Sequence, residues 1–219
     1  SKVITFNGEI YNYQTLREEL IAAGHTFTTK SDTEVLLHGY EQWGVDLLQR
    51  VRGMFTFVIW DKNKQELFGA RDHFGIKPFY YAKMNGTFMY ASEIKSLLRH
   101  PDFVKELNAE ALKPYMTFQY PAIGETFFKG VYKLPEGHYF TYRDGKMDIH
   151  RYYDEDFREG KQKLGELVNS IDQTVCDSVK AHQIADVEVG SFLSSGVDSS
   201  YVAAVARPQH TYSIGFGKG

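Results

Sequence analysis

Hydroxyl side chains are concentrated in the segment SSGVDSS, residues 194–200. It follows an apolar run, DVEVGSFL, and precedes an alanine- and valine-rich segment that predicts a helix. A turn from a strand into a helix directs unpaired backbone N–H groups and the positive end of the helix dipole at one point, which favours an anion. The serines add donors, and Gly196 permits close backbone approach. An anion site is therefore predicted, with an ordinary serine-capped helix as the alternative.

A second group of polar residues lies near the N-terminus, in the segments FNGEIYN and SDTEV. By themselves, Asn7 and Gly8 are typical of a hairpin turn. Asp32, considered alone, is typical of a helix cap.

The elements that must position these residues change in type along the chain. Most of the first 150 residues alternate β-rich runs with turns, and the runs are VITF, FTFVIW, ELFGAR, PFYYA, TFMYA and HYFTYR. Two amphipathic segments, 13–24 and 31–44, predict helices that end at Gly24 and Gly44. The turn in ARDHFGIKPFYY is interpreted as structural, with Arg71 and Asp72 paired rather than catalytic.

After Tyr153 the composition shifts to a charged stretch, DEDFREGKQK, which predicts a surface linker. Apolar residues then recur at helical spacing from Leu164 to Val179. The run DVEVGSFL predicts a buried strand, and HTYSIGF predicts another after the intervening helix. These elements make a βαβ unit, with which a parallel sheet should begin.

Composition excludes several classes of protein. The 219 residues are 42% hydrophobic and carry a net charge of −3, which describes a globular chain of one or two domains without a nucleic-acid footprint. No apolar run reaches the roughly 18 residues of a membrane span, and no signal peptide is evident, so a cytoplasmic protein is expected. One cysteine and the lack of HExxH or paired CxxC spacing predict no metal centre built by the protein.

The loop SSGVDSS resembles the SGGxDS pyrophosphate loop of the ATP pyrophosphatases, enzymes that cleave ATP between its α and β phosphates. Ser195 stands where that pattern has its second glycine. The stretch FNGEIYNYQTLREEL is similar to the glutaminase domain of the glutamine-hydrolysing asparagine synthetases. This resemblance continues through SDTEV, RGMFTFVIWD, ARDHFGIKPFYYA, SEIKSLL and KLPEGHYF to the loop, and so covers nearly the whole chain.

The resemblance implies a four-layer αββα sandwich of the N-terminal nucleophile hydrolase type over residues 1–153. Residues 154–219 would begin a doubly wound α/β domain of the ATP pyrophosphatase type. The implied enzyme converts aspartate, ATP and glutamine to asparagine, AMP, pyrophosphate and glutamate through an aspartyl adenylate, with Mg²⁺ accompanying ATP. No nucleic acid or membrane partner is expected, and the oligomeric state stays open, a homodimer included.

The resemblance also implies the site residues. Asn7 and Gly8 would form the oxyanion hole of the glutaminase, and Glu9 and Asp32 would hold the α-ammonium group of glutamine. The ATP site would consist of Leu193, Ser194, Ser195, Gly196, Val197, Asp198, Ser199 and Ile214, the last beside the adenine.

The family's nucleophile is an N-terminal cysteine upstream of the FNGEIYN motif, and only six residues precede Asn7 here. Ser1 is not expected to replace it, because it lies on the strand that leads into the oxyanion hole. The chain is therefore expected to be an internal fragment, inactive by itself. Two rivals remain: a relative that amidates or cyclises another carboxylate, and a non-enzymatic interaction or regulatory module. An intact glutamine site counts against the cyclases.

Overall fold

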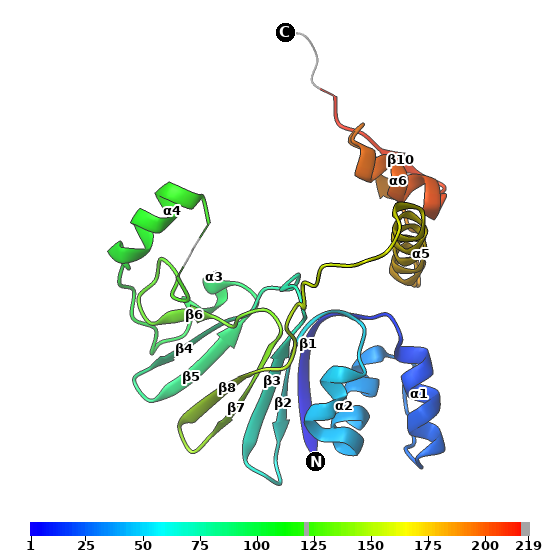
Figure 1. The fold of residues 1–219 in the computed structure, drawn as a ribbon. Coiled ribbons are helices and arrows are strands. Elements are labelled where there is room, and N and C mark those ends of the chain that lie inside the picture. Colours follow the sequence, from blue (N-terminus) through cyan, green and yellow to red (C-terminus); the bar gives the residue numbers. More distant parts are fainter. Residues whose placement is uncertain (121–122, 216–219) are drawn as a thin grey trace. The chain divides into compact units, whose positions relative to one another are not determined.

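The computed structural model describes residues 1–120 and 123–215 (Figure 1). The chain divides into two compact units, Ser1–Glu155 and Asp156–Gly219. Each unit has its own secondary structure and is described by itself.

A five-stranded antiparallel sheet forms the centre of the N-terminal unit, with strand order β1-β2-β3-β7-β8. The strands are β1 (Lys2–Ile10), β2 (Gly53–Asp61), β3 (Glu66–Arg71), β7 (His138–Arg143) and β8 (Lys146–Arg151). Side chains alternate between the two faces of a strand, and β2 is buried on both faces. Phe55, Phe57 and Ile59 therefore face one way, and Thr56 and Val58 the other.

Helices cover the first of these faces. They are α1 (Tyr13–Ala22), α2 (Asp32–Trp43) and the 3₁₀ segment η1 (Gly44–Gln49). Leu16 and Leu20 of α1 and Leu36 of α2 pack with Phe55 and Phe57 into one buried core. The predicted helices 13–24 and 31–44 are confirmed, and burial of their apolar faces against β2 supplies their stability.

A second, three-stranded sheet lies on the opposite face, with order β5-β4-β6. Its strands are β4 (Tyr80–Met84), β5 (Thr87–Ala91) and β6 (Val131–Lys133). The two sheets enclose an aromatic core in which Phe88 packs against Phe140 and stacks on Tyr142 with ring centroids 4.4 Å apart.

The second sheet is covered in turn by a short helix, α3 (Ile94–Leu97), whose Leu97 packs on Met89. The segments η2 (Ala109–Ala111) and α4 (Leu112–Phe118) follow it along the chain. Helices, sheet, sheet and helix make four layers, so the predicted αββα sandwich is confirmed (Figure 1).

The C-terminal unit contains α5 (Leu164–His182), β9 (Ser191–Phe192), α6 (Val197–Ala206) and β10 (Thr211–Tyr212). The two strands pair in parallel, which confirms the predicted βαβ unit. The prediction of a buried strand over DVEVGSFL is wrong, because only two residues pair and Phe192 is 79% exposed. A two-stranded sheet leaves most of its surface uncovered. No helix in the described part of the chain is long and apolar enough to cross a membrane.

Candidate active site

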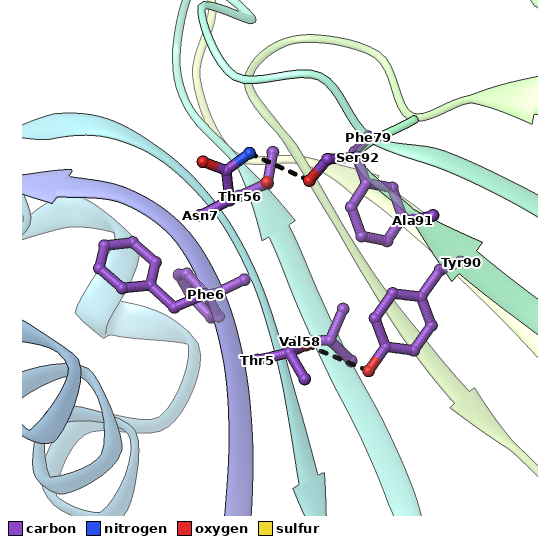
Figure 2. Close-up of a pocket in the computed structure, with 10 residues that line it drawn as sticks. Thr5, Phe6, Asn7, Thr56, Val58, Phe79, Tyr90, Ala91 and Ser92 are labelled. Carbon is purple, nitrogen blue, oxygen red and sulfur yellow. Dashed lines mark hydrogen bonds between the residues drawn. The ribbon is translucent and has the colours of Figure 1, made fainter. Parts of the chain in front are cut away.

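Asn7 lies near the end of β1, on the face that looks toward the second sheet. Its Nδ2 donates a hydrogen bond to Ser92 Oγ at 3.0 Å, and the neighbouring Thr5 hydroxyl contacts Tyr90 Oη at 3.1 Å (Figure 2). These residues line a cavity of about 170 Å³ together with Phe6, Thr56, Phe57, Val58, Phe79 and Ala91. An amide donor is thus held at the wall of a small cavity between the sheets.

Gly8 follows Asn7 within β1 and lies opposite Phe55 of β2. Its φ is +153°, and a Cβ built on it would lie 2.1 Å from the carbonyl oxygen of Met54. Only glycine fits a backbone so close to its neighbour. The hairpin-turn alternative for Asn7 and Gly8 is therefore wrong, since both residues lie inside a paired strand.

Asp32 connects the start of α2 to the end of β1. Its Oδ2 accepts a hydrogen bond from the Ile10 backbone N–H at 3.0 Å. The helix cap is Ser31, whose Oγ accepts from the Thr33 N–H at 3.1 Å. The helix-cap alternative for Asp32 is therefore wrong.

Glu9 stands between these groups in the chain, on the same side of β1 as Asn7, and its side chain is exposed. The structure thus brings Asn7, Gly8, Glu9 and Asp32 together at one end of β1.

Glu34 holds the loop that leads into α2, a role that no sequence motif indicated. Its two carboxylate oxygens accept hydrogen bonds from the backbone N–H groups and hydroxyls of Thr28 and Thr29. Burial by itself raises the pKa of Glu34, but these hydrogen bonds outweigh it and lower the pKa to about 2. Ser92 was missed as well, because its contact with Asn7 spans 85 residues of sequence.

Arg71 and Asp72 hold the turn that follows β3. The buried Arg71 guanidinium donates to the backbone carbonyls of Gly75, Lys77 and Leu134. The Asp72 carboxylate accepts from the backbone N–H groups of Phe55, Phe74, Ile76 and Lys77. A structural role agrees with these bonds, but the predicted pairing of Arg71 with Asp72 is wrong, because each side chain binds backbone groups instead.

Ser1 cannot react with a carbonyl group held at Asn7. Ser1 precedes β1, and six residues of extended strand span about 20 Å. Cys176, the only cysteine in the sequence, lies on α5 in the C-terminal unit.

The loop of the C-terminal unit connects β9 to α6. Ser199 Oγ accepts from the Ser194 N–H at 3.3 Å and donates to the Gly196 carbonyl at 3.1 Å. Gly196 is the N-cap residue of α6, and no side chain caps this helix. The serine-capped alternative is therefore wrong, and the helix N-terminus with its hydroxyls faces solvent.

Ile214 follows β10 and is 83% exposed. The Leu193 N–H donates to the Tyr212 carbonyl at 2.8 Å, and the Ser213 hydroxyl donates to the Leu193 carbonyl at 2.6 Å. These bonds bring the loop and the segment after β10 to the same end of the parallel pair, which is where ligands bind in α/β sheets.

Ser195 has a φ of +64°, in the left-handed region that costs a residue with a Cβ about 1 kcal/mol. This conformation explains why the usual loop pattern has glycine at the position. Ser195→Gly is expected to stabilise the C-terminal unit by about 0.5 kcal/mol, after the larger chain entropy of unfolded glycine is subtracted. Ser200→Gly, within α6, should destabilise it. Hydrogen exchange of the α6 amides measures both effects, and faster exchange in the Ser195 variant than in the unchanged chain would contradict the prediction.

A four-layer αββα sandwich, with the Asn7 amide near the end of the edge strand β1, agrees with the fold of one class of protein, the class II glutamine amidotransferases. Residues 1–153 match the family described as glutamine amidotransferase domain, and the chain belongs to that family. Residues 170–219 match the family described as asparagine synthase.

Curated relatives extend the similarity. The chain is 45% identical over 218 residues to glutamine-hydrolysing asparagine synthetase 1 of Bacillus subtilis, covering 97% of this chain and 34% of that protein. It is 34% identical over 208 residues to amidase chry2 of Gibberella zeae, covering 91% of this chain and 30% of that protein. The chain thus spans about a third of the length of these relatives.

A solved structure supports the fold alone. The structure titled as the allosteric regulatory enzyme of purine biosynthesis aligns with a TM-score of 0.50 at 17% identity, over 95% of this chain and 44% of that one.

Proposed function

We propose that this chain belongs to an enzyme that hydrolyses glutamine in its N-terminal unit and uses the released ammonia to amidate aspartate at the expense of ATP. The observation that carries the proposal is the convergence of Asn7, Gly8 and Asp32 at the end of β1. Similarity to asparagine synthetases over both units supports it.

Asn7 and Gly8 act as the oxyanion hole in this proposal. When a thiolate adds to the glutamine amide, charge develops on the carbonyl oxygen, and donors fixed beforehand stabilise it. The Asn7 amide has two N–H groups, of which one is directed at Ser92. The other can donate to the oxyanion, so the contact with Ser92 orients the catalytic amide.

Glu9 and Asp32 bind the α-ammonium group of glutamine. Asp32 uses Oδ2 to hold the Ile10 N–H, and its Oδ1 accepts a hydrogen bond from the Ser31 hydroxyl at 3.4 Å. Each carboxylate oxygen has a second lone pair that can accept from a ligand beside the end of β1. The exposed Glu9 carboxylate stands on the same end of the strand. Two acidic groups at this place favour an amino acid over a simple amide.

Asp32→Asn is expected to raise KM for glutamine at least tenfold while kcat changes less than threefold. The contact is made in the ground and transition states alike, so its loss acts on binding. Steady-state kinetics of glutamate formation by the whole protein measures this, with Asp46→Asn in η1 as the matched control. An unchanged KM would show that Asp32 only holds the backbone.

The second unit binds ATP in the proposal. Its loop, Leu193–Ser199, holds the pyrophosphate, and Ile214 contacts the adenine. The aspartate carboxylate attacks the α-phosphorus of ATP and displaces pyrophosphate, and ammonia then displaces AMP from the aspartyl adenylate. Mg²⁺ fits this place because Asp198 offers an exposed carboxylate beside the loop, and when bound it would neutralise phosphate charge.

The acceptor acid separates this proposal from its nearest rival. Similarity to a fungal amidase favours a second candidate, in which the same two units amidate another carboxylate. Pyrophosphate release by the whole protein, with glutamine and ATP present, should depend on aspartate and not on glutamate or β-alanine. Release with another acid alone would support the rival, and no release with any acid would favour a non-enzymatic role.

The 219 residues by themselves are expected to hydrolyse no glutamine, because the only cysteine lies outside the N-terminal unit. Glutamate formed by this chain, after removal of contaminating glutaminase, would contradict the cysteine mechanism.

A further inference from the structure

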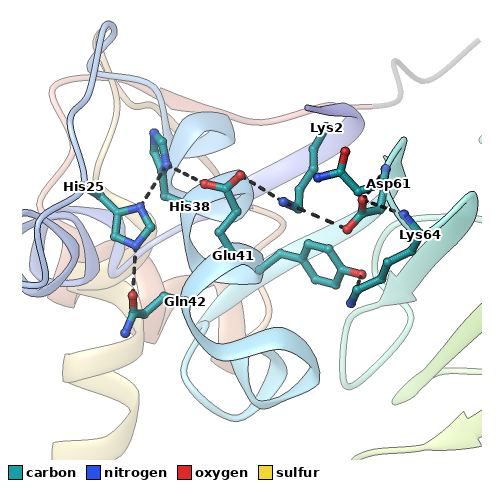
Figure 3. A network of polar contacts seen from close by, with 9 residues as sticks. Lys2, His25, His38, Glu41, Gln42, Asp61 and Lys64 are labelled. Atoms are coloured by element: carbon teal, nitrogen blue, oxygen red, sulfur yellow. Dashed lines mark hydrogen bonds and ion pairs between the residues drawn. The ribbon is translucent and has the colours of Figure 1, made fainter.

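His25, His38 and Glu41 bring three ligand atoms within 4.8 Å of one another, away from the residues of the proposed glutamine site. His25 Nδ1 lies 3.2 Å from His38 Nδ1, and His38 Nδ1 lies 3.3 Å from Glu41 Oε2 (Figure 3). His25 follows α1, whereas His38 and Glu41 lie one turn apart on α2. The cluster therefore joins a loop to a helix.

The distances of 3.2 and 3.3 Å between these ligand atoms are close to the distance between two ligand atoms bound to the same metal ion. Zinc binds imidazole nitrogen and carboxylate oxygen at about 2.0–2.1 Å, and two such ligands at a tetrahedral angle lie about 3.4 Å apart. Without an ion, two ring nitrogens this close can share only one proton, so the same geometry suits either a proton or a metal.

The neighbouring side chains orient the ligands. His25 Nε2 lies 3.0 Å from Gln42 Oε1 and must donate to it, which leaves the lone pair of Nδ1 directed at His38. His38 Nε2 lies 3.6 Å from Glu34 Oε1, and Lys2 Nζ lies 3.0 Å from Glu41 Oε1. Each ligand thus has its other polar atom occupied by an outer partner, as in metal sites of proteins.

Charge and access also fit a cation. Two carboxylates, Glu34 and Glu41, face His38, against one ammonium group, that of Lys2. The His38 side chain is 21% exposed and that of Glu41 38%, so an ion can enter from solvent. Two nitrogen ligands and one carboxylate select zinc or a similar transition metal over magnesium.

We propose that His25, His38 and Glu41 bind one zinc ion, which fastens the loop after α1 to α2. Its role is structural, because Lys2, the neighbour of Glu41 on β1, is separated from Asn7 by about 17 Å of extended strand. The sequence predicted no metal centre, and this cluster departs from that prediction because its ligands follow no standard spacing.

The experiment is a calorimetric titration of the untagged, chelator-treated 219-residue chain with ZnCl₂. We expect saturable binding of one ion per chain, none with MgCl₂, and a rise in Tm of about 5 to 10 °C at a hundredfold excess over Kd. His25→Gln and Glu41→Gln should each weaken zinc binding at least tenfold.

His100→Gln is the matched control, because His100, on the surface of the same unit, pairs with one carboxylate among the described residues, that of Asp102 at 3.8 Å. It should bind zinc as the unchanged chain does. Circular dichroism verifies that each variant folds, and the exposed Glu41 provides the variant least dependent on packing. The proposal would be overturned if the unchanged chain bound no stoichiometric zinc. It would also be overturned if both ligand variants bound zinc as tightly as the unchanged chain.

Discussion

Asn7→Ala is expected to lower glutamine hydrolysis by the whole protein about a hundredfold to a thousandfold, while ammonia-dependent synthesis continues. Removal of one oxyanion donor costs roughly 2.7–4 kcal/mol of transition-state stabilisation, which corresponds to that range. The side chain is held by Ser92 at the wall of the cavity, so its amide is fixed before substrate arrives. Synthesis from free ammonia needs no oxyanion hole.

Two variants separate catalysis from folding. Thr5→Val removes the hydroxyl that contacts Tyr90 in the same cavity and should leave glutamine hydrolysis within threefold. Ser92→Ala loses only the contact that orients Asn7 and should fall between the two. Glutamate formation and ammonia-dependent pyrophosphate release are measured for each. Equal loss of both activities in Asn7→Ala would show that Asn7 supports the fold instead.

The layers of the N-terminal unit follow from alternation that is visible in the sequence. In β2, Phe55, Phe57 and Ile59 face the helices, and Thr56 and Val58 face the second sheet. A strand that is apolar on both faces must be buried on both faces, and the amphipathic helices α1 and α2 cover one of them. The second sheet covers the other face. The two sheets stack through contacts of Phe88 with Phe140 and Tyr142, which no local sequence pattern reveals.

Tertiary pairing, and not local turn or cap propensity, determines the conformation of Asn7, Gly8 and Asp32. The dipeptide Asn7-Gly8 is typical of a turn, yet pairing of β1 with β2 along nine residues places it inside a strand. The same holds for Asp32, where Ser31 takes the cap and releases the carboxylate for Ile10. Tertiary pairing outweighs turn and cap propensities of about 1 kcal/mol each.

Contacts distant in sequence could not be predicted. Asn7 and Ser92, 85 residues apart, meet because two sheets stack, and His25 meets His38 because the loop after α1 folds back on α2. The local signal for the proposed zinc site was the spacing of His38 and Glu41, which lie three residues apart on one helix face.

Asp198→Ala is expected to lower aspartate-dependent pyrophosphate release at least a thousandfold and to spare glutamine hydrolysis. Asp198 lies in the first turn of α6, where an acidic side chain stabilises a helix by only about 0.3–1 kcal/mol. Loss of so small a stabilisation of the helix cannot account for a thousandfold loss of pyrophosphate release. A carboxylate beside bound phosphates would repel them unless a cation lies between, so we propose that Asp198 holds the cation that accompanies ATP.

Asp198→Asn distinguishes that role from simple repulsion, since it keeps the shape and removes the charge. If Asp198 holds the cation, the asparagine variant should lose pyrophosphate release nearly as fully as the alanine variant. If it merely repels phosphate, the asparagine variant should bind ATP more tightly and retain activity. Asp186→Ala, an exposed acid of the same unit, is the control and should change neither activity. Normal pyrophosphate release by Asp198→Ala would remove the loop from the proposed mechanism, because its one charged group would then do nothing for the nucleotide.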